Sequence, residues 1–100
     1  MSVPDKTELP SGFYCYMVEC ADGSFYTGWS TDPQRRTQEH NRTLKGARYT
    51  RTRRPVRLVY VEPQADRGAA MRRELQLKNM SHAQKQRLVQ QTPPDPSQED

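Results

Sequence analysis

Residues 13–29 read FYCYMVECADGSFYTGW and contain two strand patterns separated by a turn. The first part, residues 13–20, is aromatic and sulfur-rich with a single charge, which is typical of a buried strand. Residues 21–24 read ADGS, a strong signal for a hairpin turn. Residues 25–29 supply the returning strand. We therefore expect an antiparallel β-hairpin here.

The length of this turn determines on which face of the sheet Tyr16 and Tyr26 lie. A two-residue loop places the two tyrosines on opposite faces. A three-residue loop, with Gly23 in the left-handed region as a bulge, makes them diagonal neighbours on one face. In that second register Gly28 lies opposite Tyr16 and leaves room for its ring. The residues leave both registers open, and two ordinary core tyrosines are the simpler interpretation.

A helix is expected directly after the hairpin. Asp32 suits an N-cap and Pro33 the first helical position, where its missing N–H costs nothing, so the helix runs to about Asn41. Residues 43–54 contain Gly46 and many arginines and indicate a loop or a broken short helix. The hairpin is thus followed by a helix and an arginine-rich connection.

A third strand is expected over residues 56–62, which read VRLVYVE. Strict alternation along a strand places Leu58 and Tyr60 on one face. The same alternation places Val59 and Val61 on the other face. This strand completes a small sheet with the hairpin.

Two further helices are expected beyond this strand. The first begins at Asp66 or Gly68 and ends near Asn79. The second begins at a capping box, SHAQ at residues 81–84, and ends near Gln90. The order of elements predicts an α+β fold, with a small three-stranded antiparallel sheet flanked by helices.

The composition limits the size of the core. The chain has 100 residues, 32% apolar residues and a net charge of +4, and its Leu, Val and Phe total 14 with no Ile. These values exclude a transmembrane helix and a multidomain enzyme. We expect one domain over residues 12–91, between tails at residues 1–11 and 92–100 that are rich in Pro and acids. The start of the chain does not resemble a secretory signal, which favours a cytoplasmic protein with reduced cysteines.

Positive charge is concentrated in residues 35–57, which hold nine basic residues and the single acid Glu39. Eight of the nine are arginine, whose planar fork suits phosphate. A segment of this density attracts polyanions, of which DNA is the first candidate and RNA is not distinguished from it. A solvated charged face is the alternative, but such faces usually mix signs. The residues expected to contact phosphates are Arg35, Arg42, Lys45, Arg48, Arg51, Arg53 and Arg54.

Glu74 is an unusual residue on the helix that follows the third strand. It is expected to share a face with the apolar residues Ala70, Met71 and Leu77. A carboxylate on an apolar stripe is costly unless it is paired or binds a metal. An ion pair is the alternative to a metal site, with candidate partners Arg36, Arg72 and Lys78.

Five elements occur in a fixed order along the chain: YCY at residues 14–16, YTG at residues 26–28, then Arg36, His40 and Glu74. Four longer strings accompany them: EHN at 39–41, GARYT at 46–50, RRPVRLVY at 53–60 and RRE at 72–74. Together these elements resemble the GIY-YIG nuclease superfamily, and in particular its small single-domain bacterial branch, the YhbQ-like proteins.

The resemblance implies an enzyme that hydrolyses DNA phosphodiester bonds using one divalent cation, Mg²⁺ or Mn²⁺. Our leading hypothesis adds low sequence specificity and a role in DNA repair. The resemblance also implies that Tyr16 and Tyr26 are the two motif tyrosines and that Arg36 is the catalytic arginine. It places His40 near the nucleophilic water and makes Glu74 the metal ligand.

The chemistry of hydrolysis agrees with these residue types. A tyrosine beside a cation is expected to have a lowered pKa and to act as a base. A single carboxylate suits Mg²⁺, which keeps most of its waters. The alternative from another class is a nucleic-acid-binding module of the same fold that does not cut. No membrane partner is expected, whereas a protein partner would serve for targeting.

Overall fold

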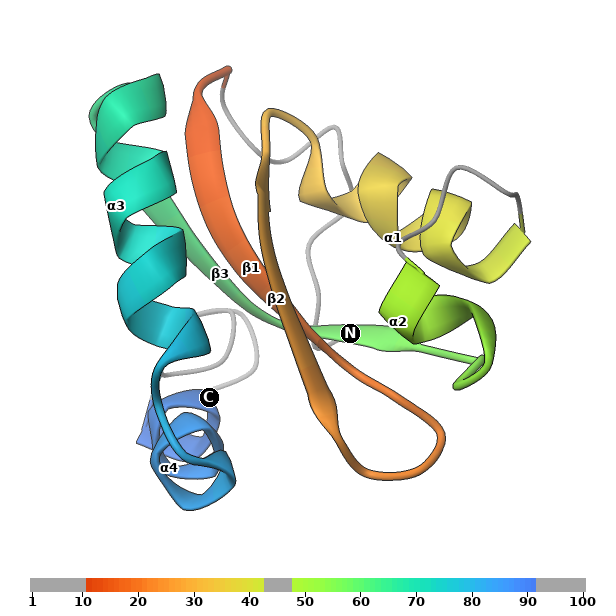
Figure 1. Cartoon of the computed structure of the whole chain (residues 1–100). Helices are drawn as coiled ribbons and strands as arrows, with labels where there is room; N and C mark the ends of the chain where they lie inside the picture. The colour runs from red at the N-terminus through yellow and green to blue at the C-terminus, as the bar shows by residue number, and fades with distance from the viewer. Residues whose placement is uncertain (1–10, 43–47, 92–100) are drawn as a thin grey trace, which may run out of the picture.

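The computed structural model describes residues 11–42 and 48–91, and within them three strands and four helices (Figure 1). The expected tails, apart from Ser11, lie outside the described residues. The elements in chain order are β1 (Phe13–Glu19), β2 (Phe25–Ser30), α1 (Pro33–Arg42), α2 (Arg48–Arg51), β3 (Arg57–Gln64), α3 (Arg67–Lys78) and α4 (His82–Gln91).

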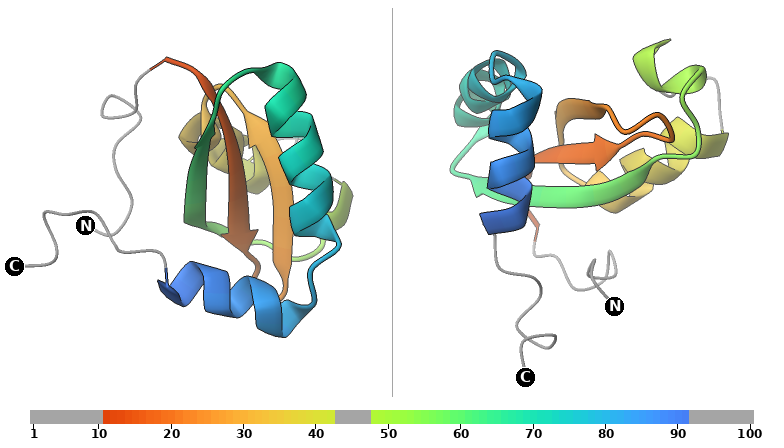
Figure 2. Two further views of the ribbon diagram at one scale, coloured as in Figure 1. Left: turned by 90° about the vertical axis from the view of Figure 1, so that its left-hand side faces the viewer. Right: turned by 90° about the horizontal axis from the view of Figure 1, so that it is seen from below.

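The three strands form one antiparallel sheet in the order β2-β1-β3, so the first strand of the chain is the central one. Helices α3 and α4 lie on one side of this sheet, and α1 and α2 lie on the other (Figures 1 and 2). The expected α+β fold, a three-stranded antiparallel sheet flanked by helices, is confirmed. Each helix in the described part of the chain is too short or too polar to cross a bilayer.

The hairpin adopts the three-residue turn. Tyr16 pairs with Gly28 and Val18 with Tyr26 across β1 and β2. Gly23 has a φ of +86°, a left-handed conformation that glycine adopts at little cost. Val18 and Tyr26 are directly opposite, so Tyr26 shares a face with Tyr16. Of the two registers that the sequence left open, the structure therefore has the one that brings the tyrosines together.

The pairing of β1 with β3 contains a β-bulge. Met17 pairs with Tyr60, but the next residue, Val18, pairs with Leu58. Val59 is therefore an extra residue, which reverses the alternation at this point. The expectation that Leu58 and Tyr60 share a face is wrong: Leu58 packs on the α1 side of the sheet and Tyr60 on the α3 side.

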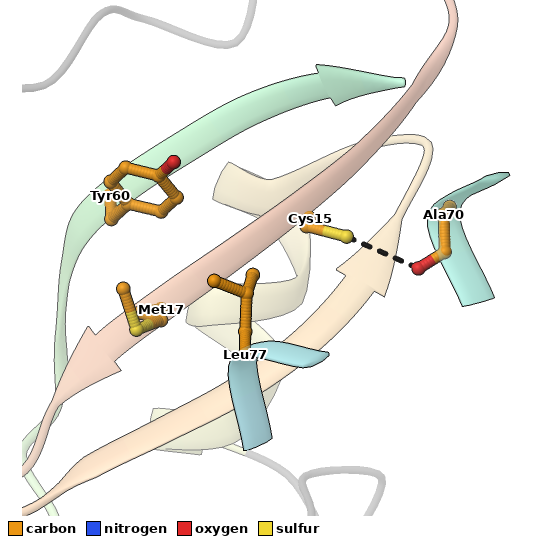
Figure 3. Packing of buried hydrophobic residues seen from close by; sticks show 5 residues of the cluster. All are labelled: Cys15, Met17, Tyr60, Ala70 and Leu77. Carbon is orange, nitrogen blue, oxygen red and sulfur yellow. Dashed lines mark hydrogen bonds between the residues drawn. The ribbon is translucent and has the colours of Figure 1, made fainter. Parts of the chain in front are cut away.

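The sheet separates two small cores. The core under α3 and α4 is shown in Figure 3 and consists of Cys15, Met17, Tyr60, Ala70 and Leu77. The core on the α1 side consists of Tyr16, Val18, Cys20, Val56 and Leu58. Both cysteines are buried and free, as expected. The thiol of Cys15 donates to the carbonyl of Ala70 over 3.2 Å, which links the central strand to α3.

Side-chain caps fix the starts of three helices. The Asp32 carboxylate accepts a backbone N–H of the first turn of α1, and Asp66 accepts the N–H of Ala69 in α3. Ser81 and Gln84 exchange the two reciprocal bonds of a capping box, of 3.2 and 2.9 Å. The three predicted helix starts are confirmed. The expected broken short helix appears as α2, while residues 43–47 lie outside the described part of the chain.

Candidate active site

Tyr16, Tyr26 and His40 form a cluster between the hairpin and α1. The hydroxyl oxygen of Tyr16 lies 2.9 Å from His40 Nε2, and both side chains are buried. The ring of Tyr26 meets the His40 ring edge-on, with 5.2 Å between the centroids. The central strand, the edge strand and α1 thus each contribute one ring to a single site.

Gly28 makes room for this cluster. A β-carbon built at this position would lie 2.7 Å from the Tyr16 hydroxyl oxygen and 2.9 Å from Cζ of the same ring. Neither atom can move freely, because Tyr16 is buried in the core on the α1 side. Position 28 therefore requires a residue without a side chain, as the sequence indicated.

Thr50 completes the surroundings of His40. Its hydroxyl oxygen lies 2.9 Å from His40 Nδ1, and Thr50 is fully buried in the short helix α2. Both nitrogens of the imidazole are therefore bound to side chains. Thr50 could not be selected from the sequence, because a threonine in an arginine-rich stretch carries no local sign of burial. Its place in the string GARYT was the only signal.

Burial sets the charge states of this cluster. It lowers the pKa of His40 from 6.5 to about 4, with a further contribution from the charge of Arg36, so the imidazole is neutral at neutral pH. Burial also raises the pKa of Tyr16 well above its usual range, and the neighbouring Tyr26 adds to this. Arg36 opposes that rise but does not overcome it. In these surroundings Tyr16 is protonated at neutral pH, and Arg36 alone does not lower its pKa below the ordinary value.

Arg36 lies beside the cluster on α1. It lowers the pKa of Tyr16 both by its positive charge and as a hydrogen-bond donor. Its charge also lowers the pKa of His40. Its guanidinium Nη1 donates to Glu39 Oε1 over 3.0 Å, one turn further along the same helix. The side chain is partly exposed, which leaves it accessible to an anion.

Glu74 lies on α3, which packs on the other side of the sheet from α1 (Figure 1). Its side chain is 22% exposed, and its Oε2 lies 3.5 Å from Nζ of Lys78. Its negative charge contributes to the raised pKa values of both Tyr16 and Cys15, whose side chains lie on opposite faces of the sheet. Glu74 is thus within electrostatic reach of Tyr16.

The apolar stripe expected around Glu74 is only partly present. Ala70 and Leu77 are fully buried, but Met71 is 53% exposed. The expectation for Met71 is wrong because one residue further along a helix is rotated by about 100°. Met71 therefore points away from the sheet that covers Ala70. Glu74 lies at the border of the buried face, where Lys78 pairs with it.

The family model described as the GIY-YIG catalytic domain matches residues 12–87. The chain belongs to the GIY-YIG family. Its match spans both tyrosine motifs, α1 and the helix that holds Glu74. The family resemblance that the motifs carried is confirmed.

Similar GIY-YIG proteins include several named only as UPF0213 proteins. The chain is 51% identical over 84 residues to UPF0213 protein DP2720 of Desulfotalea psychrophila, covering 84% of this chain and 76% of that protein. It is 49% identical to UPF0213 protein VNG_2274C of Halobacterium salinarum, covering 75% of this chain and 96% of that protein. These names assign no activity.

Two solved structures share the fold. The solution NMR structure of UPF0213 protein BH0048 from Bacillus halodurans matches with a TM-score of 0.52 and 44% identity, over 80% of this chain and 84% of that one. The solution NMR structure of EF2693 from E. faecalis gives a TM-score of 0.53 at 37% identity, over 82% and 85% of the two chains.

The described residues that were predicted to contact phosphates fall into two groups. Arg35, Arg42, Arg48 and Arg51 are exposed on α1 and α2, although Arg35 also lies 3.5 Å from Glu39. This first group is accessible to phosphates. Lys45, which was expected to join it, lies outside the described residues.

Arg53 and Arg54 form the second group and have partners within the chain. Arg53 pairs with Asp22 in the hairpin turn over 3.1 Å and stacks on the ring of Tyr49 at 4.0 Å. Arg54 donates to the backbone carbonyl of His40. Both side chains therefore hold α2 against its neighbours. Arg53 and Arg54 were expected to contact phosphates, and their roles within the fold could not be predicted from the sequence.

The residues available for a metal are few. In the described ranges no group of three or more His, Cys, Asp and Glu side chains is arranged to hold a cation. Glu74 is the carboxylate that the motif pattern selects as the metal ligand, and its charge acts on Tyr16. A single carboxylate fits a cation such as Mg²⁺, which retains its waters and completes its shell with substrate phosphate oxygens.

Proposed function

We propose that this GIY-YIG protein is a nuclease that hydrolyses phosphodiester bonds of DNA with one divalent cation, Mg²⁺ or Mn²⁺. Its proposed partner is DNA, which it cleaves with low sequence specificity. Its proposed role is in DNA repair, and its proposed location is the cytoplasm. The observation that carries the proposal is the cluster of Tyr16, Tyr26 and His40 beside Arg36, on one face of the sheet.

Tyr16 and His40 together can supply the base. A neutral tyrosine accepts a proton from water only if it gives up its own, and the neutral imidazole of His40 lies 2.9 Å from its hydroxyl. As the water oxygen attacks phosphorus, a water proton passes to the Tyr16 oxygen and the Tyr16 proton passes to His40 Nε2. The bond from phosphorus to the leaving oxygen then breaks, and His40 is left as the imidazolium.

Arg36 and Glu74 would act on the charges of the reaction. The partly exposed guanidinium of Arg36 can bind two non-bridging phosphate oxygens and stabilise the charge that develops on them. Glu74 would hold the cation, which when bound supplies Lewis-acid stabilisation of the leaving oxygen. The exposed Arg42, Arg48 and Arg51 would bind flanking phosphates, which position a strand without reading its sequence.

Incubation with branched, nicked and single-stranded DNA in Mg²⁺ or Mn²⁺ tests the proposal. We expect cleavage by the wild type, and loss of cleavage with retained DNA binding in Arg36→Ala and in Glu74→Gln. Lys78→Gln is the matched control for Glu74, because it removes the ion pair on α3 and keeps the carboxylate. Unchanged cleavage in Glu74→Gln would contradict the proposal.

A binding module that does not cut is the second candidate. It requires only the exposed guanidinium groups of Arg42, Arg48 and Arg51, which can bind phosphates without a base or a cation. It predicts DNA binding that weakens steeply with salt and is not accompanied by turnover in either metal. The cleavage experiment above therefore distinguishes the two candidates directly.

A further inference from the structure

We infer that Thr50 is a positioning residue: its hydroxyl accepts the Nδ1–H of His40 and thereby keeps Nε2 free of a proton and directed at the Tyr16 hydroxyl. The catalytic consequence of this inference rests on the proposed function. The tautomer of His40 does not rest on the proposed function, because it depends only on the contacts of a buried ring with two hydroxyl groups.

The geometry requires His40 to have two different bonds. Its Nε2 lies 2.9 Å from the Tyr16 hydroxyl oxygen, and its Nδ1 lies 2.9 Å from the Thr50 hydroxyl oxygen. All three residues are at most 1% exposed. A neutral imidazole donates from one nitrogen and accepts at the other. One of the two hydroxyls therefore donates to the ring and the other accepts from it.

The relative acidity of the two hydroxyls determines the direction. A phenol is a far stronger acid than an aliphatic alcohol, so Tyr16 is the better donor and Thr50 the better acceptor. Arg36 acts on the Tyr16 oxygen as a donor, and a guanidinium cannot accept. The Tyr16 proton is therefore directed at His40 Nε2, and the ring proton is on Nδ1, toward Thr50.

The attachment of α2 fixes Thr50 in place. The backbone carbonyl of Arg53 accepts from Ala21 N over 2.9 Å, and its side chain pairs with Asp22 over 3.1 Å. Arg54 donates to the carbonyl of His40 itself. A four-residue helix is thus tied both to the hairpin turn and to α1, so Thr50 reaches His40 from a firmly held backbone.

Nitrogen-15 NMR of the histidine ring tests the tautomer without any substrate. The chain has two histidines, and a His40→Gln sample identifies which signals belong to His40. At neutral pH we expect the wild type to carry the ring proton on Nδ1 and none on Nε2. A wild-type spectrum with the proton on Nε2 would overturn the inference, and this measurement needs no variant at Thr50.

Two substitutions at Thr50 isolate the hydroxyl. Thr50→Val replaces the hydroxyl by a methyl group, and we expect the ring proton to move to Nε2, where Tyr16 can accept it. Thr50→Ser keeps a hydroxyl and should keep the wild-type tautomer. An unchanged tautomer in folded Thr50→Val would overturn the inference.

Cleavage kinetics then test the consequence. In Thr50→Val we expect kcat to fall by about tenfold or more, because Nε2 no longer accepts the Tyr16 proton. We expect KM to stay near its wild-type value, and Thr50→Ser to restore kcat. An unchanged kcat with the moved proton would overturn the positioning role. Absence of cleavage by the wild type would instead overturn the proposed function, whereas the tautomer would still be decided by the spectra.

Discussion

Gly28 and Tyr16 face each other on neighbouring strands, and the space between them admits no further carbon atom. We expect Gly28→Ala to lower the free energy of unfolding by about 1–3 kcal/mol, the usual cost of overpacking a core. Urea unfolding measures this loss, and a disturbed His40 signal in the NMR spectrum would accompany it.

Gly68→Ala is the matched control for Gly28→Ala. A β-carbon at Gly68 would lie 3.3 Å from the end of the flexible Arg72 side chain, which can move aside. This helical position should gain stability by up to about 1 kcal/mol, because alanine loses less backbone entropy than glycine. Equal losses at both positions would contradict the account of Gly28.

His40 makes the stability of the fold depend on pH. Its pKa is about 4 in the folded protein against an ordinary value of 6.5. Between these values the unfolded chain holds a proton on this ring that the folded chain does not. The free energy of unfolding therefore falls as the pH falls through this window. The contribution of His40 is on the order of 3 kcal/mol.

Urea unfolding at several pH values between 7 and 4 measures this dependence. The His40→Gln variant serves as the comparison, because it lacks the titrating ring while all other groups are kept. We expect a flatter profile in the variant across the window. Parallel profiles would show that the burial of His40 does not control the pH dependence.

Helix α2 depends on its tertiary contacts, because four residues are far too few for a stable isolated helix. Arg53 makes the contacts to Asp22 and Tyr49 that hold it. We expect Arg53→Ala to lower the free energy of unfolding by about 1–2 kcal/mol and to speed amide hydrogen exchange in α2. Arg51→Ala removes the same charge from an exposed position and should change stability by less than about 0.5 kcal/mol. Equal losses of stability in Arg53→Ala and Arg51→Ala would contradict this role and would make Arg53 an ordinary exposed arginine.

Element types could be predicted from the sequence because their signals are local. The caps at Asp32, Asp66 and Ser81 and the turn at Gly23 each depend on residues within a few positions. The bulge at Val59 could not be predicted, because a strand with an extra residue has the same apolar composition as a regular one. The register of the hairpin was reduced to two alternatives, and the long-range packing of Tyr16 on His40 distinguishes them.

The residues of the candidate site, like the elements of the fold, could be predicted only in part. The motif residues Tyr16, Tyr26, Arg36 and His40 are brought together as the family pattern implied. Thr50 could not be found, because its partner is ten residues away and across a turn of the chain. The sequence also could not show which arginines of the segment are exposed and which are bound within the protein, because a charge pattern does not distinguish them.

For the whole molecule, α1 and α2 lie together on one side of the sheet (Figure 1). These two helices carry the exposed Arg35, Arg42, Arg48 and Arg51, and Tyr16 belongs to the core on the same side. We expect the affinity for DNA to fall with salt, and Arg51→Ala to reduce the slope of log affinity against log salt by about 0.9. Arg87→Ala removes the same charge from α4, on the other side of the sheet, and should leave the slope nearly unchanged. Fluorescence anisotropy with labelled DNA measures both. Equal reductions would mean that net charge alone attracts DNA.

The assignment of the tyrosine cluster as a catalytic site is tested most directly by the cleavage rate of Tyr16→Phe. This substitution removes one oxygen atom, the one that lies 2.9 Å from His40 Nε2, and keeps the ring that fills the core. With labelled DNA and saturating Mg²⁺ under single-turnover conditions, we expect cleavage by the wild type and a loss of about 100-fold or more in the variant. DNA binding should be retained. Cleavage by Tyr16→Phe at the wild-type rate would contradict the account.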